Sequence, residues 1–257
     1  MYSIRIIRDG QEIACAQGGE EAYLLFGGAY REGDAIAFSA PSRHVIVQVD
    51  AQVAPARVYL PEGEFTYRLP LSGDNPAVYP PQAFMGEKHL ITIRPAAGND
   101  YRNLAENPAD QRGEVCAYPH ATANVETRNE SVFAARNTID GVHAAAGHGE
   151  WPYGSWGIGA RTDAEMTLCF GREVVVDAVV LYLRADFPHD AWWTQATVAL
   201  DDGFEMTFPL EKKDGPQRVA LGGEHCIRSL KLHRLIKCDM PSAFPALRQI
   251  EVWGRDK

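Results

Sequence analysis

The chain has 257 residues, of which 46% are hydrophobic and 23% are charged, a globular composition whose length favours two domains over a single core. Its formal net charge of −9 provides no global basic field, so we expect neither nucleic acid nor an anionic membrane surface as a partner. No apolar run is long enough to span a bilayer, and the first residues lack the apolar core of a signal peptide. By that absence of a signal peptide, the expected location is cytoplasmic.

Residues 1–97 contain short strand-like runs separated by Gly, Pro and Asp: "YSIRIIR", "AIAFSA", "HVIVQVD", "ARVYLP", "FTYRLPL" and "LITIRPA". In "HVIVQVD" the residues Val45, Val47 and Val49 alternate with His44, Ile46 and Gln48, which predicts a strand buried mainly on one face. The sequence therefore predicts an N-terminal β-sandwich domain, whose role the residues do not identify.

Residues 98–118 interrupt the strand pattern and are predicted to link two domains. The run "YRNLAENP" can form one or two helical turns before Pro108 ends them. Tyr101 and Leu104 are available for packing, and the segment is not a flexible Gly/Ser tether, so we expect the domains to dock rigidly.

Residues 119–257 are predicted to form a second all-β domain, an antiparallel jelly roll of two sheets. Its short helical segment is "ESVFAARNTID". Its predicted strands are "AEMTLCF", "VVVDAVVLYLR", "ATVALDDG", "EMTFPL", "QRVALGG", "CIRSLKLHRLI" and "LRQIEVWG". Five scattered cysteines without a close pair predict neither a disulfide framework nor a zinc site: Cys15, Cys116, Cys169, Cys226 and Cys238.

Three stretches of the C-terminal half resemble a known family: "VFAARNTIDGVHAAAGHGEWPYGSWG", "AEMTLCFGREVVVDAVVLYLRADFPHDAWWTQATVALDDG" and "ALRQIEVWG". This pattern is similar to the discoidin (coagulation factor type C) family of galactose-binding-like modules. The resemblance covers roughly half of the chain and includes both ends of the module. It implies a jelly-roll fold and a carbohydrate-binding role.

The resemblance also implies a structural calcium ion. In such modules a turn matching Asn137-Thr138-Ile139-Asp140-Gly141 often holds Ca²⁺ together with a glutamate on the final strand, and Asp140 and Glu251 occupy these positions. The loop that follows, "VHAAAGHGEWPYGSW", departs from the family pattern because it lacks side-chain oxygens before Glu150. The alternative is that Asp140 accepts hydrogen bonds within its own turn and that Glu251 pairs with a basic neighbour.

A sugar site is expected at the loop "RADFPHDAWW", where polar and aromatic residues gather after a strong strand. By the resemblance its ligand-binding residues are Arg184, Asp186, His189 and Trp192, with Phe244 as an aromatic wall. Two alternatives remain open. One of the adjacent residues Trp192 and Trp193 points into the core if the segment is extended, and Arg184 with Asp186 forms a structural ion pair.

Other polar residues are better explained by structure than by chemistry. The acidic pair in Asp201-Asp202-Gly203 fits a hairpin turn. His143 and His148 are favoured as solvated loop residues, Trp156 as a core residue and Trp151 as an exposed one. We therefore predict a non-catalytic carbohydrate-binding protein. A protein-interaction or assembly module is the alternative, and a glycoside-processing enzyme is less favoured still.

Overall fold

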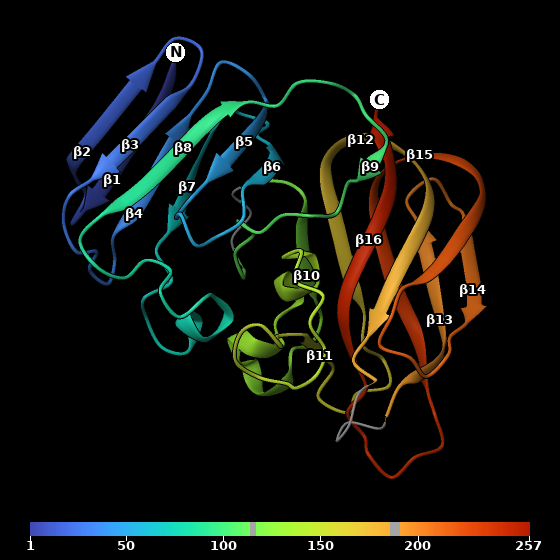
Figure 1. Cartoon of the computed structure of the whole chain (residues 1–257). Helices are drawn as coiled ribbons and strands as arrows, with labels where there is room; N and C mark the ends of the chain where they lie inside the picture. Colours follow the sequence, from blue (N-terminus) through green and yellow to red (C-terminus); the bar gives the residue numbers. More distant parts are fainter. Residues whose placement is uncertain (114–116, 186–190) are drawn as a thin grey trace.

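The computed structural model describes residues 1–113, 117–185 and 191–257. The described chain is almost entirely β-structure with antiparallel pairing, interrupted by short 3₁₀ helices (Figure 1). The predicted all-β fold class is confirmed. Among the described residues, no helix is long and apolar enough to cross a membrane.

The N-terminal strands form two four-stranded sheets that face one another. One sheet has the order β2-β1-β4-β7, and the other has the order β3-β8-β5-β6. The bounds are β1 (Tyr2–Arg8), β2 (Gln11–Gly18), β3 (Ala22–Phe26), β4 (Ala35–Ser39), β5 (His44–Gln48), β6 (Ala56–Tyr59), β7 (Glu64–Arg68) and β8 (His89–Pro95). Alternate residues of both sheets, such as Ile4, Phe38, Val47 and Ile93, fill one core cluster, as the period of two in the sequence predicts.

The C-terminal strands form one eight-stranded sheet that encloses the second core cluster. Its main order is β11-β16-β12-β15-β13-β14, with β10 paired to β12 and β9 paired to β16. The bounds are β9 (Arg102–Asn103), β10 (His120–Ala123), β11 (Trp156–Gly157), β12 (Met166–Leu183), β13 (Trp193–Leu200), β14 (Glu205–Pro209), β15 (Gln217–Lys237) and β16 (Ala246–Asp256).

Two pairs of predicted strands are single long strands in the structure. β12 joins "MTLCF" to "VVVDAVVLYL", and β15 joins "QRVALGG" to "CIRSLKLHRLI". The predicted breaks are wrong because the glycines there make irregularities within a strand: Gly171 has a φ of 67° and Gly222 a φ of 79°. Leu168 and Val176, on either side of Gly171, face the same core.

The segment 98–118 contains no helix among its described residues, so the predicted helical turn in "YRNLAENP" is wrong. Asn103 instead lies in β9, paired with Trp253, and its side-chain oxygen accepts hydrogen bonds from the backbone of Ala105 and Val252. Leu104 belongs to the C-terminal core cluster, whereas Ala109 belongs to the N-terminal one. The domain bounds stay a prediction.

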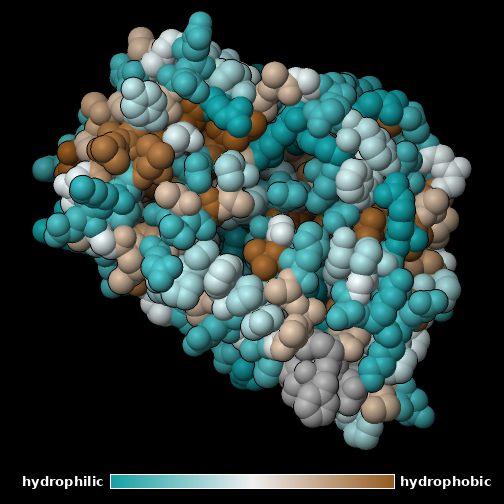
Figure 2. Space-filling model, in the orientation of Figure 1, coloured by the Kyte–Doolittle hydropathy of each residue, from teal (hydrophilic) through white to brown (hydrophobic). Residues whose placement is uncertain are grey.

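Polar contacts join the two halves at two places. Near the end of β16, the Arg172 guanidinium donates to Asp256 at 2.7 Å and lies 5.3 Å above the ring of Tyr59 in β6 of the N-terminal half. At the opposite end, Ser131 donates from its backbone N–H to Asp74 at 2.6 Å. Figure 2 shows that hydrophilic residues cover most of one face, while apolar residues gather over β3 and β8.

A buried ion pair ties the linking segment to β10. His120 Nδ1 lies 2.7 Å from Asp110 Oδ1, and both side chains are at most 3% exposed. Burial alone would lower the pKa of His120, but the hydrogen bond and charge of Asp110 outweigh it, so this pKa is raised. Burial also raises the pKa of Asp110, against the opposing effect of His120.

We expect His120 to make the free energy of unfolding fall as the pH rises from 6 to 8, against the smaller opposing effect of His44, whose pKa burial lowers. Both His120 and Asp110 bind protons more tightly when folded, and the His120 contribution is complete below its unfolded pKa of about 6.5 and lost as the pH rises through its folded pKa. Urea denaturation at both pH values measures this slope, which His120→Gln should flatten. An unchanged slope in that variant would mean that another group titrates.

Candidate functional site

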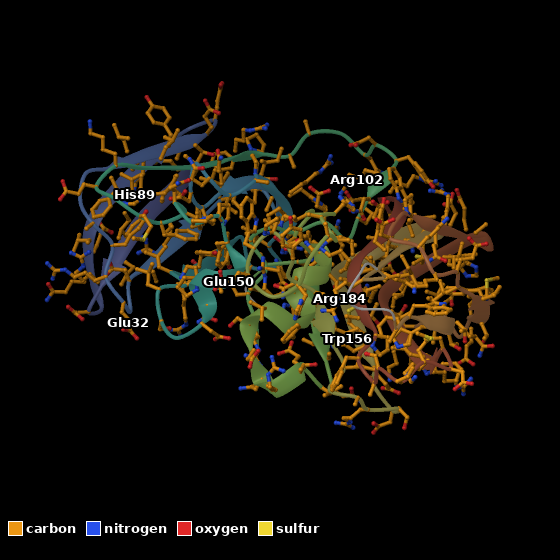
Figure 3. The ribbon with its side chains drawn as sticks, turned by 60° about the horizontal axis from the view of Figure 1, so that its bottom comes forward. Glu32, His89, Arg102, Glu150, Trp156 and Arg184 are labelled. Atoms are coloured by element: carbon orange, nitrogen blue, oxygen red, sulfur yellow. The ribbon has the colours of Figure 1, made fainter. Side chains whose placement is uncertain are left out.

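Short 3₁₀ helices and loops gather at one end of the C-terminal sheet, which we call the loop end. They include η2 (Thr127–Asn129), η3 (Ser131–Phe133) and η4 (Ala135–Ile139). The last two lie within residues 130–140, the predicted short helical segment, as two separate 3₁₀ helices. Figure 3, viewed from below relative to Figure 1, shows Arg184 and Trp156 beside the C-terminal strands and Glu150 nearer the N-terminal half. Trp156 is fully buried and Trp151 is 38% exposed, as predicted.

A pocket of about 140 Å³ opens at the loop end and brings together two of the predicted site residues, Arg184 and Phe244. We call it the loop-end pocket. It is lined by Thr127, Arg128, Phe133, His148, Gly157, Ile158, Arg184, Phe244, Pro245 and Ala246. The Phe244 side chain is 52% exposed, whereas Arg184 is only 4% exposed. The pocket thus combines an open aromatic surface with a fixed cation.

Arg184 is held at the end of β12 by the segment that carries Phe244. Its backbone N–H donates to Ala246 at 3.0 Å, and its guanidinium donates to the Phe244 carbonyl at 3.3 Å and to Ser155 Oγ at 3.4 Å. A buried guanidinium with backbone partners is preorganised, so the Arg184 side chain would lose little conformational entropy when a ligand contacts it.

Three further lining residues were not predicted for this site: Arg128, Phe133 and His148. The Arg128 guanidinium lies 5.3 Å from the Phe133 ring centroid, and His148 is exposed in the Gly-rich loop. Arg128 also has a left-handed backbone with φ of 51°, a conformation that non-Gly residues adopt at a cost. The sequence gives no periodic signal for these loop residues, since only the folded chain brings them beside Arg184.

Trp192 is not among the residues that line the loop-end pocket. Its ring lies under the Lys212 ammonium at 5.5 Å, and its backbone N–H donates to Cys238 Sγ at 3.4 Å. The neighbouring Trp193 is fully buried, which confirms that one residue of this pair points into the core. Asp186 and His189 lie outside the described residues.

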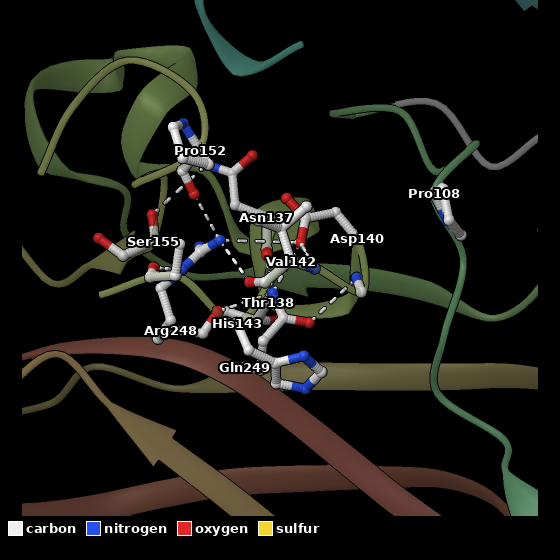
Figure 4. Close-up of polar contacts among 12 residues, drawn as sticks. Pro108, Asn137, Thr138, Asp140, Val142, His143, Pro152, Ser155, Arg248 and Gln249 are labelled. Atoms are coloured by element: carbon white, nitrogen blue, oxygen red, sulfur yellow. Dashed lines mark hydrogen bonds and ion pairs between the residues drawn. The ribbon is translucent and has the colours of Figure 1, made fainter. Parts of the chain in front are cut away.

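The predicted calcium turn is closed by two residues of β16 (Figure 4). Asp140 Oδ1 accepts from Gln249 Nε2 at 2.7 Å and from the Val142 backbone at 2.8 Å. Gly141 has a φ of 79°, as expected for a tight turn, and its N–H donates to Gln249 Oε1 at 3.1 Å. Gln249 therefore binds both sides of the turn.

The Arg248 guanidinium binds backbone carbonyl oxygens of the segment that follows the turn. It donates to the carbonyls of Ala144 at 2.6 Å, Val142 at 2.5 Å and Pro152 at 2.8 Å. It also lies 4.0 Å from Asp140 Oδ1, and its side chain is 1% exposed. Burial lowers the pKa of this guanidinium, and Asp140 opposes that effect.

Glu251 is also engaged by protein donors. It accepts from Tyr182 at 3.0 Å and from Trp253 Nε1 at 2.6 Å, and His143 Nε2 lies 3.2 Å away. No group of three or more His, Cys, Asp and Glu side chains in the described chain is placed to hold a metal. A calcium ion fits this donor set poorly, because the Arg248 guanidinium already binds the backbone carbonyl oxygens and lies beside the Asp140 carboxylate that the ion would need. Calcium binding itself stays a prediction from the resemblance.

A depression of about 690 Å³ lies on the sheet surface formed by β12–β15 and carries several acids. Two of these acids are paired: Glu165 lies 2.9 Å from the Lys231 ammonium, and Glu205 lies 2.5 Å from the Arg234 guanidinium. Asp201 belongs to the turn that joins β13 to β14, as predicted, and accepts from the Arg228 backbone at 3.1 Å. Surface ion pairs and a turn account for these carboxylates.

Comparison with family models finds no match, and comparison with curated proteins finds none either. Among solved structures, the chain is similar to chitosan-binding module 1 of a chitosanase/glucanase from Paenibacillus sp. IK-5 (17% identity, 60% of this chain, 99% of that chain, TM-score 0.41). It is also similar to a family 32 CBM from C. perfringens NanJ in complex with galactose (16%, 52% and 91%, TM-score 0.39).

A third similar structure is the lectin domain of Lectinolysin complexed with Lewis B antigen, at 18% identity, with 59% of this chain and 95% of that chain covered and a TM-score of 0.42. These three neighbours are two carbohydrate-binding modules and a lectin domain. Because each TM-score is below 0.5, the similarities assign no role to any residue of this chain.

Proposed function

We propose that this protein is a non-catalytic carbohydrate-binding protein that holds one sugar ring in the loop-end pocket. The observation that carries the proposal is the exposed Phe244 ring, which lines this pocket together with Arg184 and His148. An aromatic face packs against the C–H surface of a sugar, while a guanidinium and an imidazole donate hydrogen bonds to its hydroxyls.

The lining chemistry favours binding over hydrolysis. None of the described residues that line the loop-end pocket carries a carboxyl group. Enzymatic cleavage of a glycosidic bond generally needs two carboxyl groups on either side of that bond. Asp186 and Asp190 lie outside the described residues, so they do not enter this argument.

A glycan array tests this function directly. We expect the purified protein to bind a defined sugar equally with added calcium and with EDTA, because the Arg248 guanidinium already occupies the turn next to Asp140. The array should include galactose, glucosamine and glucose in monomeric and oligomeric forms. Binding that EDTA removes would contradict the calcium-independent form of the proposal and support the calcium expected from the resemblance.

A protein-interaction role is the second candidate, and one surface favours it. Tyr23 and Leu25 of β3 are 69% and 70% exposed, and Leu90 of β8, which pairs with Leu25, is 40% exposed. Figure 2 shows an apolar area over these two strands, as expected for an interaction surface. A blank glycan array together with a stable dimer in light scattering would favour this role over sugar binding.

A further inference from the structure

Two more depressions lie beside the segments that line the loop-end pocket, and both include residues of the N-terminal half. The middle one, of about 530 Å³, is lined by residues that directly follow or precede pocket residues in the chain: Asn129 after Arg128, Val132 before Phe133 and Gly149 after His148. The far one, of about 480 Å³, shares Asp74, Ala77 and Glu150 with the middle one. The segment His148–Trp151 therefore passes all three.

We propose that these depressions form one groove that binds a linear oligosaccharide, with its end ring against Phe244 and further rings running past Glu150 to Trp151. This inference rests on the proposed function and names its ligand class. The loop-end pocket alone, at about 140 Å³, is smaller than the ~300–1,000 Å³ usual for ligand pockets. Its two neighbours, at about 530 and 480 Å³, supply the space that a chain of rings needs.

The two ends of the groove carry the apolar surfaces that sugar rings pack against. Phe244 is 52% exposed at one end, and Trp151 is 38% exposed at the other beside Met85, which is 64% exposed. Between them the lining is polar, with Asn129 and the exposed carboxylate of Glu150. The Glu150 carboxylate accepts hydrogen bonds from hydroxyl groups and the Asn129 amide N–H groups donate them, so aromatic and polar surfaces together match the two kinds of surface on a saccharide.

Hydrogen bonds across the two halves hold the groove in shape. The Trp151 backbone N–H donates to the Ala77 carbonyl at 2.6 Å, which fixes the loop against η1 (Asn75–Val78). Ser131 Oγ donates to Asp74 at 2.9 Å and lies 2.7 Å from Asn75 Oδ1. The N-terminal half thus supplies one wall, and a groove fixed before binding costs little ordering entropy when a chain enters.

A second set of contacts fixes the turn between the first two depressions. Asn129, like Arg128, has a left-handed backbone, with φ of 59°. Arg112 binds the Asn129 side-chain oxygen and donates to its carbonyl at 2.7 Å, while its Nε donates to Glu126 at 2.5 Å. These contacts hold a costly backbone conformation between the loop-end pocket and the middle depression.

Isothermal titration with a monosaccharide and with its di-, tri- and tetrasaccharide tests the groove, using the β-1,4-linked galactose, glucose and glucosamine series. We expect affinity for one series to rise at least tenfold from one ring to four. Trp151→Ala and, separately, Glu150→Ala should remove this rise and leave monosaccharide affinity unchanged, which also shows that the variants are folded. Tyr23→Ala, a change at an aromatic residue on β3 that is more exposed than Trp151, should alter neither.

The outcomes separate this inference from the proposed function. Equal affinity for one ring and for four, with monosaccharide binding retained, would overturn the groove and leave the loop-end pocket standing. A length dependence that persists in both Trp151→Ala and Glu150→Ala would also overturn it. No binding of any of the three series would overturn the proposed function, and the groove with it.

Discussion

Replacing Arg248 by methionine is expected to lower the free energy of unfolding by about 3 kcal/mol or more. The change keeps much of the side-chain volume but leaves the carbonyls of Val142, Ala144 and Pro152 without their buried donor. Each buried acceptor left unpaired costs about 1–3 kcal/mol. Removing one partner of a buried charge pair also costs more than removing one partner of an exposed pair. Urea denaturation followed by tryptophan fluorescence measures the loss.

Arg255→Met is the matched control for this experiment. Arg255 lies on the same strand, β16, and pairs with Glu224, but both side chains are largely exposed, so we expect no measurable change in stability. Calcium should not restore the stability of Arg248→Met if the turn is built for a guanidinium. An increase in the melting temperature of the unsubstituted protein with Ca²⁺, reversed by EDTA, would instead establish the ion that the resemblance implies.

Replacing Phe244 by alanine is expected to weaken sugar binding at least tenfold, equivalent to about 1.4 kcal/mol, with no loss of stability. The ring is 52% exposed, so its removal takes little from the core, whereas stacking on a sugar contributes about 0.5–1.5 kcal/mol beyond the area it buries. Titration with the sugar that the array identifies measures the affinity.

Trp192→Ala provides the comparison that locates the site. The sequence predicts that Trp192 stacks on the sugar, but its ring lies below Lys212 and does not line the loop-end pocket. We therefore expect Trp192→Ala to bind sugar more tightly than Phe244→Ala. The reverse order would reject the loop-end pocket and favour a site centred on Trp192.

The fold was largely predictable because its signals are local. Alternating apolar residues, such as Val45 and Val47, mark strands directly, and Asp201-Asp202-Gly203 marks a hairpin. The long strands β12 and β15 were not predicted as single strands, because the glycines at positions 171 and 222 indicate a turn when only the sequence is considered. Only their pairing partners in the folded sheet decide that they are bulges.

The candidate site was predictable in part, because the family resemblance nominated both Arg184 and Phe244, which are 60 positions apart in the chain. Arg184 also follows a strong strand, which places it at a sheet end. Arg128 and His148 join them through 3₁₀ helices and loops that have no periodic pattern. The hydrogen bonds of Arg248 to backbone carbonyls were not predicted for a related reason. An arginine in a sequence does not indicate which backbone oxygens its guanidinium will bind in the folded chain.

The contacts of Arg248 also bear on how the protein folds. They join residues separated by 96 to 106 positions in the chain, and Gln249 reaches Asn137 over 112. Contacts over such distances must overcome the loop-closure entropy of the intervening chain, and folding slows as their share increases. We therefore expect the turn at Asp140 to acquire protection from amide hydrogen exchange late in refolding, only once β16 has docked beside it.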